Sequence, residues 1–319
     1  MPRIWIVSPV YFDVDSYTLL LGRLREVLAG MRLPLELEPR FIAVDDTAGL
    51  DPQLRALEGI ADLQIIVPPF NLGHQRALVH GLRRLSSEID DRDIVVTCDA
   101  DGEDRPEDLP RLLSALLAEP QPGNLRLITL AARTRRRETP AFKLLYFFFK
   151  HFFLLLSGTV VRSGNYAAYR GWVARNVVFH PHFDLCYASS LLSLNLQIER
   201  VPCERGSRYA GQSKMTYGKL TQHGFRMLMP FTDRIAVRGL VLFAVLFGTG
   251  TLALALGVAA RLAGAAVAGW LLVVLLVAVL FFGTALGLCL VLFALFSQSQ
   301  SLSMDRLRER AGRRAGDAA

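Results

Sequence analysis

The stretch Ile94-Val95-Val96-Thr97-Cys98-Asp99-Ala100-Asp101 decides the fold of this chain of 319 residues. Its apolar and β-branched first half predicts a short buried strand, and two carboxylates one residue apart follow directly. In an open α/β sheet, ligands bind at the carboxyl ends of the strands, so both carboxylates would lie at a binding edge. Mg²⁺ is usually held by one or two carboxylates together with substrate phosphates. The stretch therefore predicts a metal-nucleotide site, and an acidic turn that opens a helix is the alternative.

Strand-like and helix-like patterns alternate on both sides of this stretch. The expected strands cover Arg3–Ser8, Glu38–Val44, Gln64–Val67, Ile94–Cys98 and Arg126–Ala131, and the expected helices cover Ser16–Ala29, Leu54–Ile60, Gln75–Leu85 and Pro106–Leu117. This alternation predicts an α/β domain with a mostly parallel sheet flanked by helices. Its binding edge would gather Pro9, Asp45, Asp46 and Asn71 beside the Asp99 pair. After Arg133 we expect the alternation to stop.

Two long apolar segments lie near the C-terminus, within a chain that is 52% hydrophobic and has a mean hydropathy of +0.32. Gly239–Ala260 and Gly264–Phe296 contain no charged residue, and each is long enough to span a bilayer. Because only Arg261–Ala263 separate them, we expect a tight transmembrane hairpin, with two buried core helices as the alternative. Arginines flank both outer ends, which predicts that these ends lie in the cytoplasm.

The remaining segments complete the expected domain organisation. It comprises a cytoplasmic domain (1–219), an amphipathic juxtamembrane segment (220–238), two transmembrane helices (239–296) and a basic cytoplasmic tail (297–319). Residues 142–156 are rich in Phe and Leu but contain Lys143 and Lys150, so we expect a helix lying in the membrane interface; a core helix is the alternative. Residues Met1–Ser8 resemble a strand, so we expect no secretory leader.

The charge and the cysteines narrow the class of protein. The net charge is +7 and the isoelectric point is near 9.5. We attribute this charge to anionic lipids and phosphorylated substrates rather than to nucleic acid, because basic residues cluster beside apolar segments and no nucleic-acid-binding motif stands out. The cysteines Cys98, Cys186, Cys203 and Cys289 have no paired spacing, so we expect free thiols in a reducing compartment.

Several motifs occur together in a characteristic order: Pro9–Asp13, Val44–Asp46, Asn71–Ala77, Asp99–Pro110 and Arg208–Met215. This series resembles the family 2 glycosyltransferases, which implies a nucleotide-sugar-binding fold of the GT-A type. The stretch Arg208-Tyr209-Ala210-Gly211-Gln212-Ser213-Lys214 matches the Arg-x-x-Gly-x-Ser-Lys motif of the polyprenyl-phosphate branch. That branch includes dolichyl-phosphate mannosyltransferase and bactoprenol-phosphate glucosyltransferases, and two C-terminal spans after an interfacial helix are also similar to it.

The resemblance implies a role for each matching residue. The nucleotide-sugar would contact Pro9, Tyr11, Asp13, Asp45, Asp46, Asn71, Gly73, Arg76 and Asp99. Asp101 would bind Mg²⁺ or Mn²⁺, with Asp99 and Glu103 as further metal ligands, and the ion would neutralise charge on the leaving nucleoside diphosphate. The acceptor phosphate would contact Arg133, Arg208, Ser213 and Lys214. The implied catalytic set is Asp99, Asp101, Arg208 and Lys214.

The chain departs from the family on the acceptor side. An aspartate is usual there, whereas here Asn165 or Val160 stands near its place. A phosphate monoester is already charged near neutral pH and needs no base, whereas a hydroxyl acceptor would need one. Asp184 could supply a carboxylate, but no pattern places it in the site. The adjoining His180-Pro181-His182 stretch is interpreted as a loop near the acceptor groove rather than as a metal site.

We therefore expect an inverting, metal-dependent glycosyltransferase that moves a sugar from a nucleoside-diphosphate sugar to a polyprenyl phosphate. It would be a multi-pass protein of the cell inner membrane, with its catalytic domain at the cytoplasmic face. The alternatives are transfer to a hydroxyl-bearing lipid and a nonenzymatic membrane-anchored binding module. The residues leave the sugar, the base, the lipid and homo-oligomerisation open.

Overall fold

The computed structural model describes residues 2–31, 37–118, 123–133, 140–160, 163–210 and 217–316. The chain forms two compact units. The first consists of Met1–His151 and Thr159–Pro230, and the second consists of Phe152–Gly158 and Phe231–Ala319. Each unit is described by itself below.

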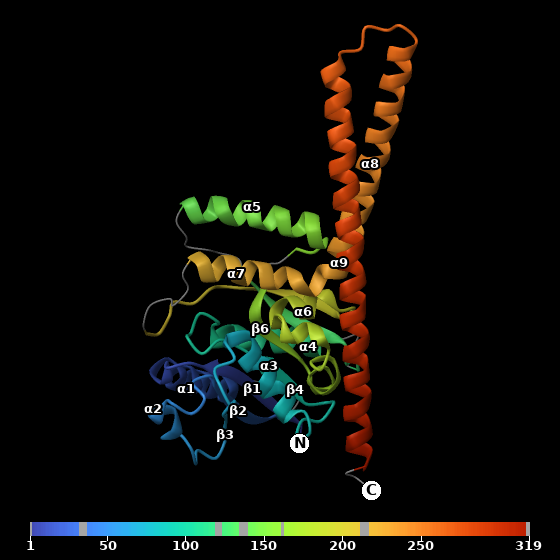
Figure 1. The fold of residues 1–319 in the computed structure, drawn as a ribbon. Helices are drawn as coiled ribbons and strands as arrows, with labels where there is room; N and C mark the ends of the chain where they lie inside the picture. Colours follow the sequence, from blue (N-terminus) through green and yellow to red (C-terminus); the bar gives the residue numbers. More distant parts are fainter. Residues whose placement is uncertain are drawn as a thin grey trace. The chain divides into compact units, whose positions relative to one another are not determined.

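The first unit is built on a sheet of seven strands in the order β3-β2-β1-β4-β6-β5-β7 (Figure 1). The strands are β1 (Arg3–Val10), β2 (Glu38–Asp45), β3 (Leu63–Ile66), β4 (Ile94–Thr97), β5 (Leu127–Arg133), β6 (Ser163–Arg170) and β7 (Gln197–Cys203). Neighbouring strands are parallel except at β6, which runs antiparallel to both β4 and β5. The predicted α/β architecture with a mostly parallel sheet is confirmed.

Helices cover both faces of the central strands. α1 (Val14–Gly30) and α4 (Leu109–Leu117) lie on one face, and α3 (His74–Leu85) lies on the other. The chain also contains α2 (Pro52–Arg55), α5 (Pro140–Ser157), which is divided between the two units, α6 (Tyr187–Ser193) and α7 (Tyr217–Leu228). Alternate side chains of β1, such as Ile4 and Ile6, share one core with α1 and α4. On the other face α3 approaches closely, because a Cβ on Gly81 would lie 2.5 Å from Val44 Cγ2. Burial on both faces explains why these strands are continuous apolar runs.

The expectation that the alternation stops after Arg133 is wrong, because β6, α6 and β7 follow. Strand β6 contains Ser-Gly-Asn-Tyr-Ala-Ala-Tyr-Arg, a mixture of small and aromatic residues without the β-branched run that marks the other strands. The antiparallel pairing of β6 with β4 keeps it buried, and Ala167 and Ala168 are fully buried between their neighbours. Tertiary pairing rather than local propensity therefore makes this segment a strand.

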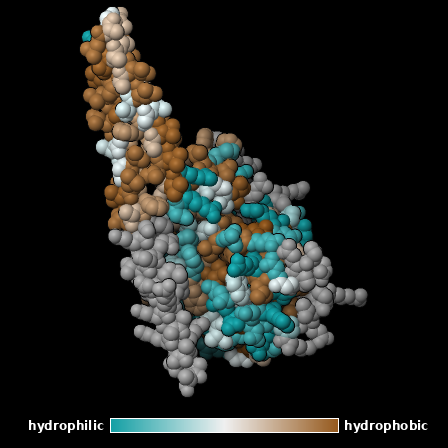
Figure 2. Space-filling model, turned by 90° about the vertical axis from the view of Figure 1, so that its right-hand side faces the viewer, coloured by the Kyte–Doolittle hydropathy of each residue, from teal (hydrophilic) through white to brown (hydrophobic). Residues whose placement is uncertain are grey.

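The second unit contains two long helices, α8 (Thr232–Leu262) and α9 (Gly269–Gly316). They pack on each other through glycines: a Cβ on Gly257 would lie 2.8 Å from Leu272, and one on Gly283 would lie 3.0 Å from Phe247. By length and composition, Thr221–Leu262 and Gly269–Leu295 could cross a membrane, and no residue of α8 is buried. Figure 2 shows mostly apolar residues on the visible face of these helices.

One detail of the expected hairpin is corrected. The connection spans Ala263–Ala268 rather than Arg261–Ala263, because Gly264 adopts a φ of +87° and α9 begins only at Gly269. Within the segment 220–238, a 3-10 turn at Met229–Phe231 separates α7 from α8. Pro230 lies in this turn and lacks the N–H that would continue the helical hydrogen bonds.

Candidate functional site

The acidic loop that follows β4, residues Asp99–Asp104, is held by hydrogen bonds from its own carboxylates. Asp99 N–H donates to Asp104 Oδ2 at 3.0 Å, and Glu103 N–H donates to Asp101 Oδ1 at 2.9 Å. Gly102 has a φ of +84°, a left-handed conformation that glycine adopts without strain. Asp104 is buried at 4% exposure, so the loop turns back into the protein after presenting Asp99 and Asp101.

A second loop, residues 204–209, lies against the acidic loop. An antiparallel bridge joins Asp104 to Arg205, and Tyr209 N–H donates to the Asp101 carbonyl at 3.0 Å. The Tyr209 ring covers Gly102 so closely that a Cβ at that glycine would lie 2.6 Å from it. These contacts bring the start of the Arg208 motif to the Asp99 motif, although about a hundred residues separate them.

Arginines from this second loop and from β5 pair with the acidic side chains. Arg208 Nη2 lies 2.5 Å from Asp101 Oδ2, and its Nε lies 3.4 Å from Glu103 Oε1. Arg205 Nη2 lies 2.5 Å from Glu103 Oε2, and Arg133 Nη2 lies 3.4 Å from Asp104 Oδ1. Cations and carboxylates therefore alternate over a small area, which suits the binding of a phosphorylated ligand with a divalent cation.

The electrostatic environments of the two aspartates differ. Burial, followed by the neighbouring Asp99, raises the pKa of the Asp101 carboxyl in spite of Arg208. Burial also disfavours the charge of Asp99, but His74 and Asn165 outweigh it and hold the pKa of that carboxyl well below its usual range. His74 Nε2 and Asn165 Nδ2 both lie 2.9 Å from Asp99 Oδ1. The surroundings of Asp99 therefore favour its charged form more than the surroundings of Asp101 do.

The residues predicted to contact a nucleotide-sugar lie near the ends of β1, β2 and β3. The carboxylate of Asp46 accepts the N–H groups of Leu72 at 2.8 Å and Gly73 at 3.2 Å, and Asn71 Nδ2 donates to the Asp46 carbonyl at 2.7 Å. Asp45 is fully buried, and its carboxylate accepts three hydrogen bonds within its own turn, from Thr47 N–H, Thr47 Oγ1 and Gly49 N–H. Asp46 thus joins the end of β2 to the start of α3, and Asp45 shapes the β2 turn.

The loop after β1 carries two exposed aromatic rings. Pro9 lies near the end of β1, and the rings of Tyr11 and Phe12 meet edge to face at 5.0 Å. Phe12 has a φ of +46°, which is uncommon for a residue with a side chain. Asp13 precedes α1 without capping it through its side chain. The strained turn keeps both rings at the surface, next to the end of β1.

Other predicted residues have partners that the sequence did not suggest. Arg76 Nε donates to the Asp184 carbonyl at 3.0 Å, and Arg83 Nη1 lies 2.5 Å from Asp184 Oδ1. Asp184 is thus tied to α3. His182 Nδ1 lies 3.1 Å from Ser193 Oγ, an interaction that holds a structural turn. The predicted Ser213 and Lys214 lie outside the residues that the structure describes.

Sequence reasoning missed His74, Gln75 and His223. His74 and Gln75 lie in the motif that begins at Asn71, where only the glycine and the arginine were assigned roles. His223 is half-buried on α7, close enough to His74 and Asp99 for their charges to act on it. The amphipathic pattern of residues 220–238 gave no signal that this histidine lies within range of the Asp99 charge.

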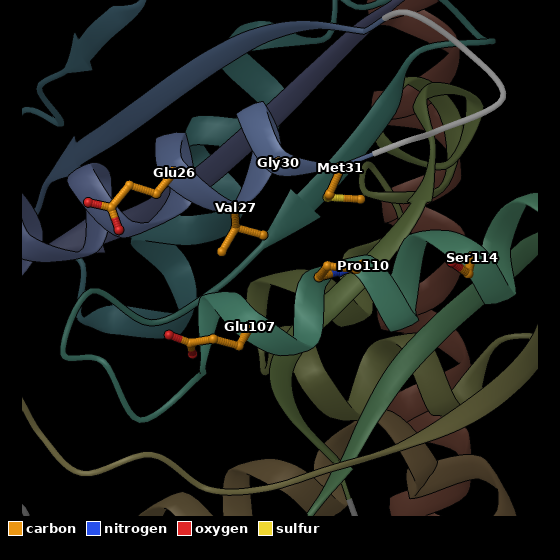
Figure 3. A pocket seen from close by; sticks show the side chains of 7 residues that line it. All are labelled: Glu26, Val27, Gly30, Met31, Glu107, Pro110 and Ser114. Carbon is orange, nitrogen blue, oxygen red and sulfur yellow. The ribbon is translucent and has the colours of Figure 1, made fainter.

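The structure also contains a cavity of about 480 Å³ between α1 and α4, bordered by the 3-10 turn Pro106–Asp108 (Figure 3). Its lining residues are Glu26, Val27, Gly30, Met31, Glu107, Pro110 and Ser114. None of the predicted site residues lines this cavity, so it is distinct from the acidic loop.

The acidic loop can be tested for its fit to a divalent cation. Within the described ranges, no three His, Cys, Asp or Glu side chains are grouped as metal ligands. Mg²⁺, however, takes one or two carboxylates and completes its shell with phosphates and water. Asp101 and Glu103 supply such oxygens, and both are now paired with Arg208. The carboxylate oxygens of Asp101 and Glu103 therefore fit a cation that binds together with a diphosphate and displaces Arg208.

This chain is similar to a known protein family and to several solved structures. The family model described as glycosyl transferase family 2 matches residues 6–176. No match is found among curated proteins. One similar solved structure is mannosyl-3-phosphoglycerate synthase from Rubrobacter xylanophilus, with 15% identity over 75% of this chain and 75% of that chain and a TM-score of 0.47. Another is S. aureus TarS 1-349, with 10% identity over 76% and 86% of the two chains and a TM-score of 0.38.

Proposed function

This chain belongs to glycosyl transferase family 2, and from that premise we propose that it transfers a sugar from a nucleoside-diphosphate sugar to a polyprenyl phosphate at the cytoplasmic face of a membrane. The α/β fold is GT-A-like, as expected of the family. The single observation that carries the proposal is the ion pair between Arg208 and Asp101. It joins the second loop (residues 204–209, the cationic loop), whose arginines suit phosphates, to the acidic loop, whose carboxylates suit a metal ion.

The donor would bind at the carboxyl ends of β1, β2 and β4. Tyr11, Asp46 and the turn at Asn71–Gly73 would contact the nucleoside, and Gly73, with a φ of +77°, lets the backbone approach it. Asp101 and Glu103, with Asp99, would hold Mg²⁺ or Mn²⁺, which when bound neutralises charge on the leaving diphosphate. Arg208, released from Asp101, would then contact a phosphate in bidentate fashion.

The acceptor side favours a nucleophile that needs no base. The residue near the usual acidic position is Asn165, whose amide cannot take a proton, and its Nδ2 is bonded to Asp99. A phosphate monoester carries about −1.5 to −2 charge near neutral pH, so it requires orientation by cations rather than deprotonation. Arg133, Arg205 and Arg208 supply cations at this place, and Ser213 and Lys214 are proposed to complete the set. A direct displacement would invert the anomeric carbon.

The apolar helices support a lipid acceptor. Both α8 and α9 contain segments long and apolar enough to span a bilayer. On α5, Phe147, Phe148 and Leu155 are more than half exposed, an arrangement that suits a helix lying in the membrane interface. We propose that the membrane-bound protein has the domain boundaries expected from the sequence, including a cytoplasmic tail at 297–319.

A second candidate, transfer to a lipid hydroxyl, is favoured by one observation. His223, on α7, lies close enough to Asp99 for the charge of that carboxylate to act on it. A neutral imidazole is a suitable general base. If the acceptor is a hydroxyl, His223→Gln should abolish transfer. If the acceptor is a phosphate, the same variant should retain most of it.

The test uses the full chain in lipid vesicles with Mg²⁺ or Mn²⁺ and a panel of radiolabelled nucleotide sugars. Separate vesicles contain undecaprenyl phosphate, dolichyl phosphate or diacylglycerol. The proposal predicts a labelled lipid only with a polyprenyl phosphate, from which mild acid releases the sugar, and no product from Asp101→Asn. Product only with diacylglycerol would favour the second candidate. Donor binding without product from any pair would indicate a binding module and contradict the proposal.

A further inference from the structure

Two side-chain amides connect the first turn of α6 to Asp99. Ala188 N–H donates to Gln75 Oε1 at 3.3 Å, and Gln75 Nε2 donates to Asn165 Oδ1 at 2.7 Å. Asn165 Nδ2 then donates to Asp99 Oδ1 at 2.9 Å. The chain runs through three elements that are distant in sequence: α6, the start of α3 and β6.

The direction of this chain is fixed at Ala188. A backbone N–H can only donate, so the Gln75 atom that faces it must be the carbonyl oxygen, and the amide nitrogen must face Asn165. Asn165 must then present its own oxygen to Gln75 and its nitrogen to Asp99 and to His74 Nε2, which lies 2.7 Å from that nitrogen. The polarity of a distant peptide group therefore determines that Asp99 meets a donor.

The chain is sheltered from water at its centre. Asn165 is only 6% exposed, and its carbonyl accepts a hydrogen bond from Thr97 Oγ1 at 2.5 Å. Hydrogen bonds to a charged acceptor are stronger than neutral ones, and a low dielectric strengthens them further. His74 Nε2 lies near the same oxygen of Asp99, so Oδ1 is occupied on two sides. In the part of the chain that the structure describes, no hydrogen bond to Asp99 Oδ2 occurs.

We propose that Gln75 and Asn165 are positioning residues, which hold Asp99 by Oδ1 and leave Oδ2 for the cation and diphosphate of the donor. This inference rests on the proposed function. It also accounts for an amide near the usual acidic position: a carboxylate there would repel Asp99 and could not donate to it.

The decisive variants change the polarity at position 75 with little change in size. In Gln75→Glu, the new carboxylate still accepts from Ala188 N–H but needs a donor from Asn165. The Asn165 amide must then turn over and direct its oxygen at Asp99. In the matched control Gln75→Met, nothing forces the Asn165 amide to turn, although Ala188 N–H loses its partner. Asn165→Leu removes the donor to Asp99 directly.

The measured quantity is the affinity of the full chain for Mn²⁺, followed by electron paramagnetic resonance. We expect Gln75→Glu and Asn165→Leu to weaken Mn²⁺ binding about tenfold, the equivalent of one hydrogen bond to a charged group, and Gln75→Met to change it less than about twofold. The added negative charge of Gln75→Glu would by itself attract Mn²⁺, so weaker binding cannot arise from that charge. The double variant Gln75→Glu with Asn165→Leu should bind Mn²⁺ no more weakly than Asn165→Leu alone, because both substitutions act through one contact and the added negative charge can only attract the ion.

Thermal unfolding of the same variants separates positioning from structural support. Gln75→Met leaves a helix N–H unpaired, whereas a carboxylate is favoured at a helix N-terminus, so Gln75→Met should be the less stable variant. A positioning role thus predicts opposite orders for stability and Mn²⁺ affinity. If the affinities follow the stabilities, or if the effects in the double variant add, the inference is wrong. If the wild-type chain does not bind Mn²⁺, or if Asp101→Asn binds it equally well, the proposed metal site is wrong and this inference is wrong with it.

Discussion

Removal of the Arg208 cation should make the chain bind a metal ion more tightly but a diphosphate more weakly. In Arg208→Met the apolar stem of the side chain is kept while the guanidinium is lost. That guanidinium lies 2.5 Å from Asp101 Oδ2 and 3.4 Å from Glu103 Oε1, so it occupies the oxygens that a cation would use. A metal ion that binds without nucleotide must first displace it.

The magnitude follows from the geometry of the pair. Two unit charges at about 4 Å interact by about 4 kcal/mol at an effective dielectric constant of about 20. The Arg208 side chain is 30% exposed, so solvent screening reduces this. A net cost of about 1–2 kcal/mol for displacing the arginine corresponds to a five- to thirtyfold gain in Mn²⁺ affinity for the variant. Loss of a bidentate phosphate contact should weaken nucleoside diphosphate binding by about tenfold or more.

Two titrations of the full chain test this prediction. Mn²⁺ binding without nucleotide is followed by electron paramagnetic resonance, and binding of nucleoside diphosphates in saturating Mn²⁺ is followed by calorimetry. Arg23→Met is a matched control, because Arg23 pairs only loosely with Glu107, at 4.0 Å, away from the acidic loop. Unchanged or weaker Mn²⁺ binding by Arg208→Met would refute the idea that this arginine and the metal compete for one site.

Three further outcomes are expected. Gly102→Ala should lower the melting temperature and weaken diphosphate binding, because a left-handed alanine is strained by about 1–2 kcal/mol and its Cβ would meet Tyr209. Full binding and full stability of this variant would contradict the close packing of the two loops. Trp5→Phe removes the 2.9 Å hydrogen bond from Nε1 to buried Asp93 and should cost about 1–3 kcal/mol of unfolding free energy without altering Mn²⁺ affinity, whereas an altered affinity would show that this end of the sheet communicates with the site. Removal of divalent ions with a chelator should abolish transfer and Mg²⁺ or Mn²⁺ should restore it, so undiminished transfer in the chelator would exclude the proposed role of the acidic loop.

Much of the first unit could be predicted because its strands are buried on both faces. β1, β2 and β4 each contain a continuous apolar run, and α3 and α4 begin close to their expected starts. β6 could not be found in this way, since its identity depends on pairing with β4. The break at Pro230 was readable as a proline, but only the structure shows that a 3-10 turn divides the segment there.

The candidate site was predictable to the extent that its residues follow strands. The position of Asp99 and Asp101 at the end of β4 follows from the apolar run before them. The contacts of Asp99 with His74 and Asn165 do not, because they join the loop after β4 to the start of α3, 25 residues earlier, and to β6, 66 residues later. Nor could the sequence show that the Asp45 carboxylate accepts hydrogen bonds within its own turn, while the Asp46 carboxylate accepts a hydrogen bond from the backbone just before α3. Such assignments depend on tertiary geometry rather than on spacing.

The cationic and acidic loops are proposed to form the site at which a sugar is transferred to a phosphate on a lipid. Transfer of radiolabelled sugar into vesicles that contain either a polyprenyl phosphate or the matching polyprenol, which differ only in the phosphate, tests this proposal. We expect a labelled lipid with the phosphate alone, and its loss in Asp101→Asn. Equal transfer to the polyprenol, or transfer that survives Asp101→Asn, would contradict the proposal.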